Sequence, residues 1–198
     1  MNLLTPTKSI FSKNQTGFWD NIFTFEQIQY ILALPCWTEA AHGKIGTADQ
    51  SKINFDVRQS RTAWMPRDNQ TEIIYNALAH NLAQANAEIF NFELKGFSEI
   101  QCGIYSGTDQ DHYSWHADSS YLVPGMSRKL SVSILLDDVS TFEGGKMEVK
   151  LDSNESVELE QRLGRALLFP SYMLHRVTPV TKGVRRSLVV WLVGPDFR

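Results

Sequence analysis

The chain of 198 residues contains few cysteines and has no large excess of either positive or negative charge. Its two cysteines, Cys36 and Cys102, stand far apart and form no CxxC pair. This argues against a thiolate zinc site or a disulfide framework, and it favours two buried reduced thiols over a single bridge. The 19 basic residues are balanced by 22 acidic residues. Without a basic excess, neither nucleic acid nor anionic lipid is an expected partner.

Long apolar runs are also missing. No stretch approaches the roughly 20 apolar residues that a membrane span needs. The N-terminus is interrupted by Pro6, Lys8 and Lys13, and it lacks the apolar core of a secretion signal. The composition, 42% hydrophobic and 21% charged, is typical of an ordinary globular protein. We therefore expect a soluble, intracellular, cytoplasmic protein with a single domain.

The first half of the chain has helical patterns. Thr24 and Gln27 form a capping-box pair before a short apolar stripe, and Pro35 ends that run. A second, longer helix is predicted to begin near Asn69, with Glu72 three residues later. Its apolar positions follow helical spacing and predict one buried face, formed by Ile74, Leu78, Leu82, Ala85 and Ile89.

Strand patterns dominate the second half. Residues 53–65 contain β-forming residues without helical periodicity, which predicts one strand or two. From Glu99 onward, turn signals separate eight short apolar segments. This spacing predicts an antiparallel sandwich or barrel of the jelly-roll type. The expected fold class is mainly β, with residues 1–95 as helical support and residues 96–198 as the jelly-roll core.

One of these segments, HYSWHAD, has the wrong polarity for an ordinary core strand. Its small and polar residues alternate with larger or apolar ones, so they are predicted to share one face of a strand. Two of them, His116 and Asp118, would then lie about 6.6 Å apart at the backbone, close enough to meet at one cation. The polar set consists of His112, Ser114, His116 and Asp118.

A third ligand is available from His175, which lies on a predicted strand far downstream. Distant strands of a jelly roll can face each other, and two imidazoles with one carboxylate form the facial triad of non-haem Fe(II) oxygenases. The His-x-Asp pattern alone is weak, because it occurs often by chance and either residue could be a hydrogen-bonded strand-end residue. Further support comes from Arg185 and Ser187, which share a predicted strand face and could bind a carboxylate.

Together these residues resemble the Fe(II)/2-oxoglutarate-dependent dioxygenases, specifically the prolyl-4-hydroxylase branch, which has related sequences in bacteria and phages. The resemblance covers about residues 55–198. It implies a double-stranded β-helix, a distorted jelly roll, with N-terminal helices packed on one sheet. The matching segments follow the family's order and are RQSRTAWM, HYSWHAD, RKLSVSILLDD, FEGGKMEV and GRALLFPSYMLHRVTPVTKGVRRSLVVW.

The resemblance also implies roles for particular residues. Arg185 matches the residue that pairs with the distal carboxylate of 2-oxoglutarate, and Ser187 would support that carboxylate. Tyr105 matches a tyrosine that reaches the cosubstrate in related hydroxylases. The implied cofactors are Fe(II), 2-oxoglutarate and O2, with ascorbate as a further candidate. The implied catalytic iron ligands are His116, Asp118 and His175.

The expected reaction is hydroxylation of an unactivated C–H bond, with release of succinate and CO2. The branch favours a prolyl residue in a peptide or protein. The alternatives are a free amino acid or small metabolite as substrate, and a metal-binding jelly roll without turnover. Residues 40–68 resemble the region that folds over the substrate in prolyl hydroxylases. The candidate substrate-contacting residues are Arg58, Arg61, Trp64, Tyr113, Trp115 and Arg128. Of these, Tyr113 and Trp115 also fit a role in the core.

Overall fold

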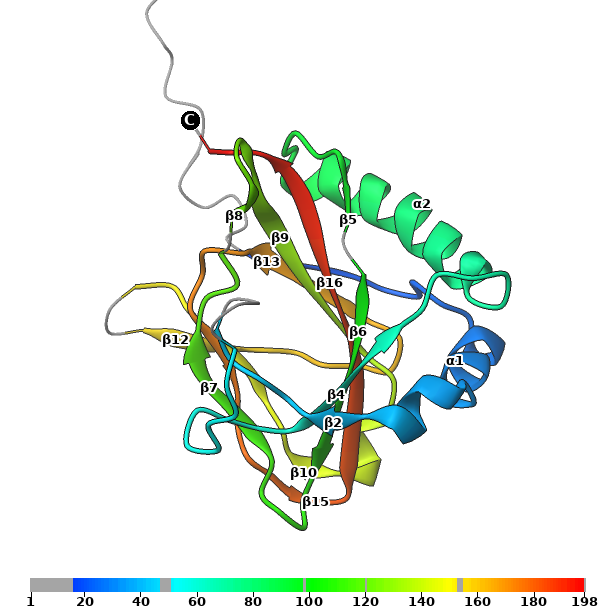
Figure 1. The fold of residues 1–198 in the computed structure, drawn as a ribbon, viewed down its shortest axis with the longest axis vertical. Coiled ribbons are helices and arrows are strands. Elements are labelled where there is room, and N and C mark those ends of the chain that lie inside the picture. Colours follow the sequence, from blue (N-terminus) through cyan, green and yellow to red (C-terminus); the bar gives the residue numbers. More distant parts are fainter. Residues whose placement is uncertain (1–15, 47–50, 98, 120, 153–154, 198) are drawn as a thin grey trace, which may run out of the picture.

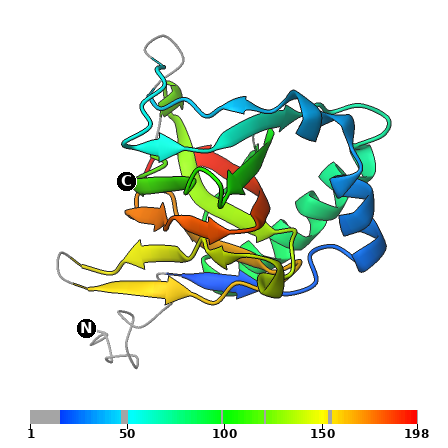
Figure 2. The ribbon, with the colours of Figure 1, turned by 90° about the horizontal axis from the view of Figure 1, so that it is seen from below.

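Two antiparallel sheets face each other, and the helices lie together beside the larger sheet (Figure 1; Figure 2). The fold is mainly β, as predicted, and has the jelly-roll arrangement. The computed structural model describes residues 16–46, 51–97, 99–119, 121–152 and 155–197.

The larger sheet forms the side of the molecule that the helices cover. Two short strands, β5 (Gly96–Phe97) and β8 (Tyr121–Val123), pair with its central strands β16 and β9. Its strand order is β1 (Gly17–Trp19), β13 (Ala166–Pro170), β9 (Met126–Leu135), β16 (Val184–Pro195), β6 (Ile100–Ser106), β4 (Arg61–Met65) and β2 (Ala41–His42).

The smaller sheet faces the inner side of the larger one and carries two of the predicted metal ligands. Its strand order is β12 (Ser156–Leu159), β11 (Met147–Lys150), β14 (His175–Val177), β7 (His112–His116) and β3 (Arg58–Gln59). A separate pair joins β10 (Glu143–Gly144) to β15 (Val180–Lys182).

Each of the eight segments predicted after Glu99 contains a strand. Residues 53–65 contain two strands, β3 and β4, within the predicted range. The strands that the pattern does not indicate, β8, β10 and β15 among them, are two or three residues long, too short for alternation to be visible. The first 95 residues supply strands to both sheets as well as the helices.

The first helix, α1 (Phe25–Leu32), begins as predicted. The backbone N–H of Gln27 donates to Thr24 Oγ1 at 3.2 Å, and the Thr24 N–H donates to Gln27 Oε1 at 2.8 Å, which completes the capping box. Pro35 ends this helical run and opens a 3-10 turn, η2 (Pro35–Glu39). A second 3-10 turn, η4 (Val139–Thr141), precedes β10.

The second helix, α2 (Glu72–Ile89), begins three residues later than the sequence pattern predicts. The reason is a turn before the helix, in which Asp68 Oδ1 accepts hydrogen bonds from the backbone N–H groups of Gln70 and Thr71. The Glu72 carboxylate pairs with Arg67 rather than with a capping residue. No helix in the described ranges combines the length and the apolar character that a membrane crossing requires.

Apolar side chains form two separate clusters. The larger cluster joins the buried faces of α1 and α2 to the outer face of the larger sheet, for example Leu78 and Leu82 with Val190. The smaller cluster lies between the two sheets and includes Tyr105 and Phe169. The helices therefore brace the larger sheet from outside, while the space between the sheets is only partly filled by apolar side chains.

The two cysteines lie in the larger cluster as free thiols. Their sulfur atoms are 3.7 Å apart, although Cys36 and Cys102 are 66 residues apart in sequence. Burial raises the pKa of the Cys102 thiol, which favours its protonated, unreactive form.

Packing of α2 against the sheet can be tested with Leu78, which is fully buried. We expect Leu78→Ala to lower the free energy of unfolding by about 3 kcal/mol, because it leaves a cavity in the larger cluster. On the same helix, the exposed Ile73 provides the control, and Ile73→Ala should change stability by less than about 0.5 kcal/mol. Urea denaturation followed by circular dichroism measures both. Similar losses in the two variants would contradict this account of the core.

Candidate active site

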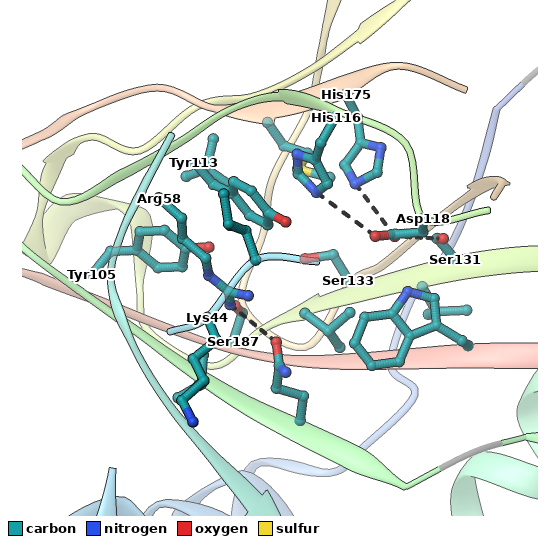
Figure 3. A pocket seen from close by; sticks show the side chains of 18 of the residues that line it. Lys44, Arg58, Tyr105, Tyr113, His116, Asp118, Ser131, Ser133, His175 and Ser187 are labelled. Carbon is teal, nitrogen blue, oxygen red and sulfur yellow. Dashed lines mark hydrogen bonds and ion pairs between the residues drawn. The ribbon is translucent and has the colours of Figure 1, made fainter. Parts of the chain in front are cut away.

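Three side chains that could ligate a metal ion meet where β7 and β14 pair. His175 on β14 lies directly opposite His116 on β7. Asp118 follows the end of β7, and its backbone N–H donates to the Ser171 carbonyl at 2.9 Å. Figure 3 shows both imidazoles pointing toward the Asp118 carboxylate. Nε2 of His116 lies 3.7 Å from Oδ1, and Nε2 of His175 lies 3.4 Å from Oδ2.

The Nδ1 atoms of the two histidines fix the orientation and the tautomer of each imidazole ring. Nδ1 of His116 lies 2.8 Å from the Ser114 carbonyl, and Nδ1 of His175 lies 2.9 Å from the Met173 carbonyl. Because a carbonyl only accepts hydrogen bonds, each Nδ1 carries the hydrogen and each Nε2 offers its lone pair to the cluster. The possible ligand atoms all lie within 4.8 Å of one another, so the set fits one divalent ion.

The local electrostatics favour the metal-binding protonation states. Burial and the nearby His175 lower the pKa of His116 to about 4, so its imidazole is neutral near pH 7. Burial alone would raise the pKa of Asp118, but its close contacts with His175 and His116 outweigh burial and hold the pKa below its usual range. A neutral imidazole and an ionised carboxylate are the forms that bind metal.

Ser131 orients the carboxylate and was not identified from the sequence. Its hydroxyl donates to Asp118 Oδ2 at 2.7 Å and lies 3.0 Å from the Ser171 hydroxyl. On β9, Ser131 and Ser133 alternate with apolar residues, and both line the cavity. That alternation of small polar residues in an otherwise apolar strand is the signal that could have indicated them.

The strand β7 departs from the predicted regular alternation. His175 pairs with His116 but Val177 pairs with Tyr113, so two steps along β14 match three steps along β7. This β-bulge puts Tyr113 on the same side as His116, and their rings stack with centroids 3.4 Å apart. The expectation that Tyr113 faces away from the metal ligands is therefore wrong.

The other polar residues of β7 lie outside the metal cluster. The Ser114 hydroxyl donates to the Asp56 carbonyl at 3.3 Å, and His112 lies beside a separate surface pocket with Gln110. Asp118 itself lies past the last strand residue. Of the four polar residues predicted to share one strand face, only His116, in the strand, and Asp118, after it, belong to the metal cluster.

A buried arginine occupies the cavity with the triad. Arg185 on β16 is 1% exposed, and its guanidinium donates to Gln161 Oε1 at 2.7 and 3.1 Å and to Ser187 Oγ at 3.2 Å. The Tyr105 ring centroid is 5.5 Å from it. Burial lowers the pKa of Arg185, yet a guanidinium stays charged at neutral pH. Within the described ranges, no carboxylate forms an ion pair with this buried cation.

Gln161 and Gly145 hold Arg185 in place. Gln161 Nε2 donates to the Gly145 carbonyl at 3.0 Å, while its Oε1 accepts from Arg185. Gly145 has a φ of +60°, and a Cβ there would come within 2.8 Å of Arg185 Cδ. Gly145 therefore allows close packing against Arg185, whereas Gly144 packs against the Pro179 backbone. No sequence pattern indicates the contact between Gln161 and Arg185.

One cavity of about 650 Å³ lies between the sheets and joins these groups. Its wall also includes residues of the predicted substrate-covering region, such as Lys44 and Ile45. The structure thus brings together all the residues assigned to the metal and the cosubstrate, namely His116, Asp118, His175, Arg185, Ser187 and Tyr105.

The candidate substrate residues divide into two groups. Arg61 is exposed and is not among the described residues that line the cavity. Trp115 lies away from it as well, packed between the side-chain cations of Lys150 and Arg176 at 5.3 and 4.7 Å. The candidates that do line the cavity are Arg58, Trp64, Tyr113 and Arg128.

Residues 100–193 match the model of the 2OG-Fe(II) oxygenase superfamily. A PKHD-type hydroxylase of Shewanella oneidensis is 32% identical over 123 residues, which cover 61% of this chain and 51% of that protein. A PKHD-type hydroxylase of Idiomarina loihiensis is 38% identical over 94 residues, which cover 44% of this chain and 41% of that protein. The chain therefore spans about half or less of the length of these relatives.

Solved structures agree on the fold. The Trichoplax adhaerens prolyl hydroxylase, solved with a hypoxia inducible factor peptide, has a TM-score of 0.71 at 19% identity, with 90% of this chain and 83% of that one covered. A prolyl-4-hydroxylase of Pseudomonas putida has a TM-score of 0.67 at 18% identity, with 90% and 92% covered. Residues 100–193 thus have the sequence features of a 2OG-Fe(II) oxygenase, and the fold of the chain is similar to that of these prolyl hydroxylases.

For an oxygenase of this superfamily, Fe(II), 2-oxoglutarate and O2 are the implied cofactor and cosubstrates. The donor set of this chain fits the metal, because two oriented imidazoles and one ionised carboxylate suit Fe(II) and leave coordination positions open. The unpaired Arg185 fits a dicarboxylate cosubstrate.

Ser131 allows a test of how the carboxylate is held. We expect Ser131→Ala to weaken Mn(II) binding about tenfold, because Asp118 loses the hydrogen bond that orients it. Ser133→Ala, on the same face of β9, should leave the affinity within about twofold. Isothermal titration calorimetry measures both. Equal affinities in the two variants would show that the hydroxyl does not orient the ligand.

Proposed function

We propose that this chain catalyses Fe(II)- and 2-oxoglutarate-dependent hydroxylation of an unactivated C–H bond, with release of succinate and CO2. A prolyl residue in a peptide or protein is the proposed target. The family match and the hydroxylase names of the relatives support the reaction type.

The main observation behind this proposal is that the candidate metal cluster and the buried Arg185 line the same cavity. The metal cluster offers a place for one end of a dicarboxylate, and Arg185 offers a buried, unpaired cation for the other end. A buried guanidinium held only by neutral groups is costly unless an anion joins it. A planar fork supported by Ser187 and Gln161 can form two parallel hydrogen bonds to a carboxylate.

His116, Asp118 and His175 would hold Fe(II). The bound metal, with 2-oxoglutarate and O2, supplies the oxidative decarboxylation and the oxidant for the C–H bond. The chain contributes positioning, because Arg185 neutralises the distal carboxylate and Ser131 orients Asp118. Burial of His175 and Arg185, with His116 and Asp118 half-buried, limits the access of water to the reacting groups.

A prolyl target is supported by two kinds of observation. The similar solved structures are described as prolyl hydroxylases, one of them with a peptide bound. The cavity also has aromatic walls, Tyr113 beside His116 and Trp64 near Trp191, which suit an apolar ring. Trp64 is about half exposed, so the cavity is open to an extended chain on that side.

Spectroscopy tests the cosubstrate assignment. Adding Fe(II) and 2-oxoglutarate without oxygen should give a weak visible charge-transfer band, and Asp118→Ala should abolish it, because a metal ligand is lost. Arg185→Gln should raise the 2-oxoglutarate concentration for half-formation of the band about a hundredfold, because the distal carboxylate loses its cation. Metal affinity in Arg185→Gln should stay within about twofold of the wild type.

The matched control is Arg176→Gln, since Arg176 lies next to His175 but pairs with Glu148 outside the cavity. It should leave the band unchanged. Absence of the band in the wild-type protein would refute the cosubstrate assignment. Equal loss of metal and 2-oxoglutarate binding in Arg185→Gln would assign Arg185 to folding instead.

Mass spectrometry tests the target. Proline-rich peptides and free amino acids are incubated with the enzyme, Fe(II), 2-oxoglutarate and oxygen. Gain of one oxygen atom on a prolyl residue, with one succinate formed per product, is the expected result. Oxygen gain only on free amino acids would redirect the proposal to a small substrate, and metal binding without succinate would indicate a binding module.

A further inference from the structure

The cavity holds more cationic side chains than the metal and 2-oxoglutarate account for. Four of its described lining residues are basic, and Asp118 is the one acidic residue among them. Asp118 is committed to the metal cluster, and the two carboxylates of 2-oxoglutarate match the metal and Arg185. The other three basic residues, which form no ion pair with a described carboxylate, are Lys44, Arg58 and Arg128.

Arg58 is buried in the cavity wall, and the groups that it contacts among the described residues are neutral. It is 8% exposed, on β3 of the smaller sheet. Its Nε donates to Ser60 Oγ at 2.9 Å and its Nη2 donates to Gln101 Oε1 at 3.1 Å, while its guanidinium lies 4.6 Å from the Tyr113 ring centroid. These bonds orient the fork but do not neutralise its charge, and a buried charge needs a counter-ion.

Arg128 approaches the cavity from the larger sheet, on β9. Its guanidinium lies 4.0 Å from the Trp191 ring centroid. Its Nε is buried and, in the part of the chain that the structure describes, has no hydrogen-bond partner. Native structures rarely leave a buried donor unsatisfied, so this group is poised to bind an acceptor that enters the cavity.

The two guanidinium groups flank the reacting region from facing sheets. Both act electrostatically on Tyr113, whose ring stacks on the metal ligand His116. Figure 3 shows Tyr113 between Arg58 and His116. An acceptor bound by Arg58 would therefore lie across the Tyr113 ring from His116, and Arg128 interacts electrostatically with Asp118.

We propose that the substrate carries a carboxylate close to the carbon that is hydroxylated, and that Arg58 and Arg128 bind this carboxylate. This inference rests on the proposed oxygenase function and adds the chemical class of the substrate. The carboxylate can come from two sources: the free α-carboxylate of an amino acid, or an acidic side chain next to the target residue of a peptide. Two guanidinium groups in a partly desolvated cavity select either one over a neutral amide.

The test compares acid and amide versions of the same compound. One pair is L-proline and L-prolinamide, and the other is the peptide Ac-Glu-Pro-Glu-NH2 and its double glutamine analogue. Oxygen-free protein is loaded with Fe(II) and 2-oxoglutarate, its charge-transfer band is recorded, and each compound is titrated by calorimetry. In at least one pair, the acid should bind about tenfold to a hundredfold more tightly than the amide. The pair that shows the preference identifies the source.

Substitutions then assign the preference to these residues. Arg128→Gln and Arg58→Gln should each reduce the acid preference about tenfold without removing the charge-transfer band. Arg58→Lys keeps the positive charge and should retain part of the preference, which separates lost charge from disturbed folding. Arg61→Gln is the matched control, since Arg61 is exposed outside the cavity lining, and it should leave the preference unchanged.

The proposed oxygenase function and the proposed carboxylate binding are refuted by different results. A wild-type protein without the charge-transfer band would overturn the proposed function itself. A normal band would leave that function standing while this inference is overturned by any of three results. These are equal binding of acid and amide in both pairs, no binding of either acid, and an acid preference that persists in both glutamine variants.

Discussion

The site depends on the register between β7 and β14. His175 lies directly opposite His116, and this pairing makes two residues 59 positions apart converge on one carboxylate. Because side chains alternate along a strand, a slip of one residue in β14 would turn His175 out of the cavity. Asp118 is held separately, by its backbone bond to Ser171 and by the Ser131 hydroxyl. Main-chain pairing of the smaller sheet thus determines how the candidate metal ligands converge.

The second determinant is the buried cation Arg185, which has no acidic partner in an ion pair among the described residues. Arg185 is held by Gln161 and Ser187, and the absence of a side chain at Gly145 makes room for it. The described residues that surround this guanidinium orient it and leave its charge for a ligand. The helices contribute indirectly, because their packing on the outer face of the larger sheet fixes β16, the strand that carries Arg185.

The sequence was most informative where a chemical pattern coincided with strand spacing. His116 and Asp118 are two positions apart in the sequence, as are Arg185 and Ser187, and the structure brings all four to one cavity. The predicted side of Tyr113 was wrong, because a β-bulge turns this residue to the side of His116. The alternation of polar and apolar residues in the sequence does not reveal the bulge. Gln161 could not be found, since it lies in a loop 24 residues from the arginine that it contacts. The start of α2 was also predicted too early, because the Asp68 side chain accepts hydrogen bonds from the backbone of the preceding turn.

The most direct measurement is a crystal structure obtained without oxygen in the presence of Mn(II) and 2-oxoglutarate. The account predicts Mn(II) bound by Nε2 of His116, Nε2 of His175 and the Asp118 carboxylate, with the distal carboxylate of 2-oxoglutarate on Arg185. A metal ion bound elsewhere would contradict the account. So would a 2-oxoglutarate molecule that leaves Arg185 bonded only to Gln161 and Ser187.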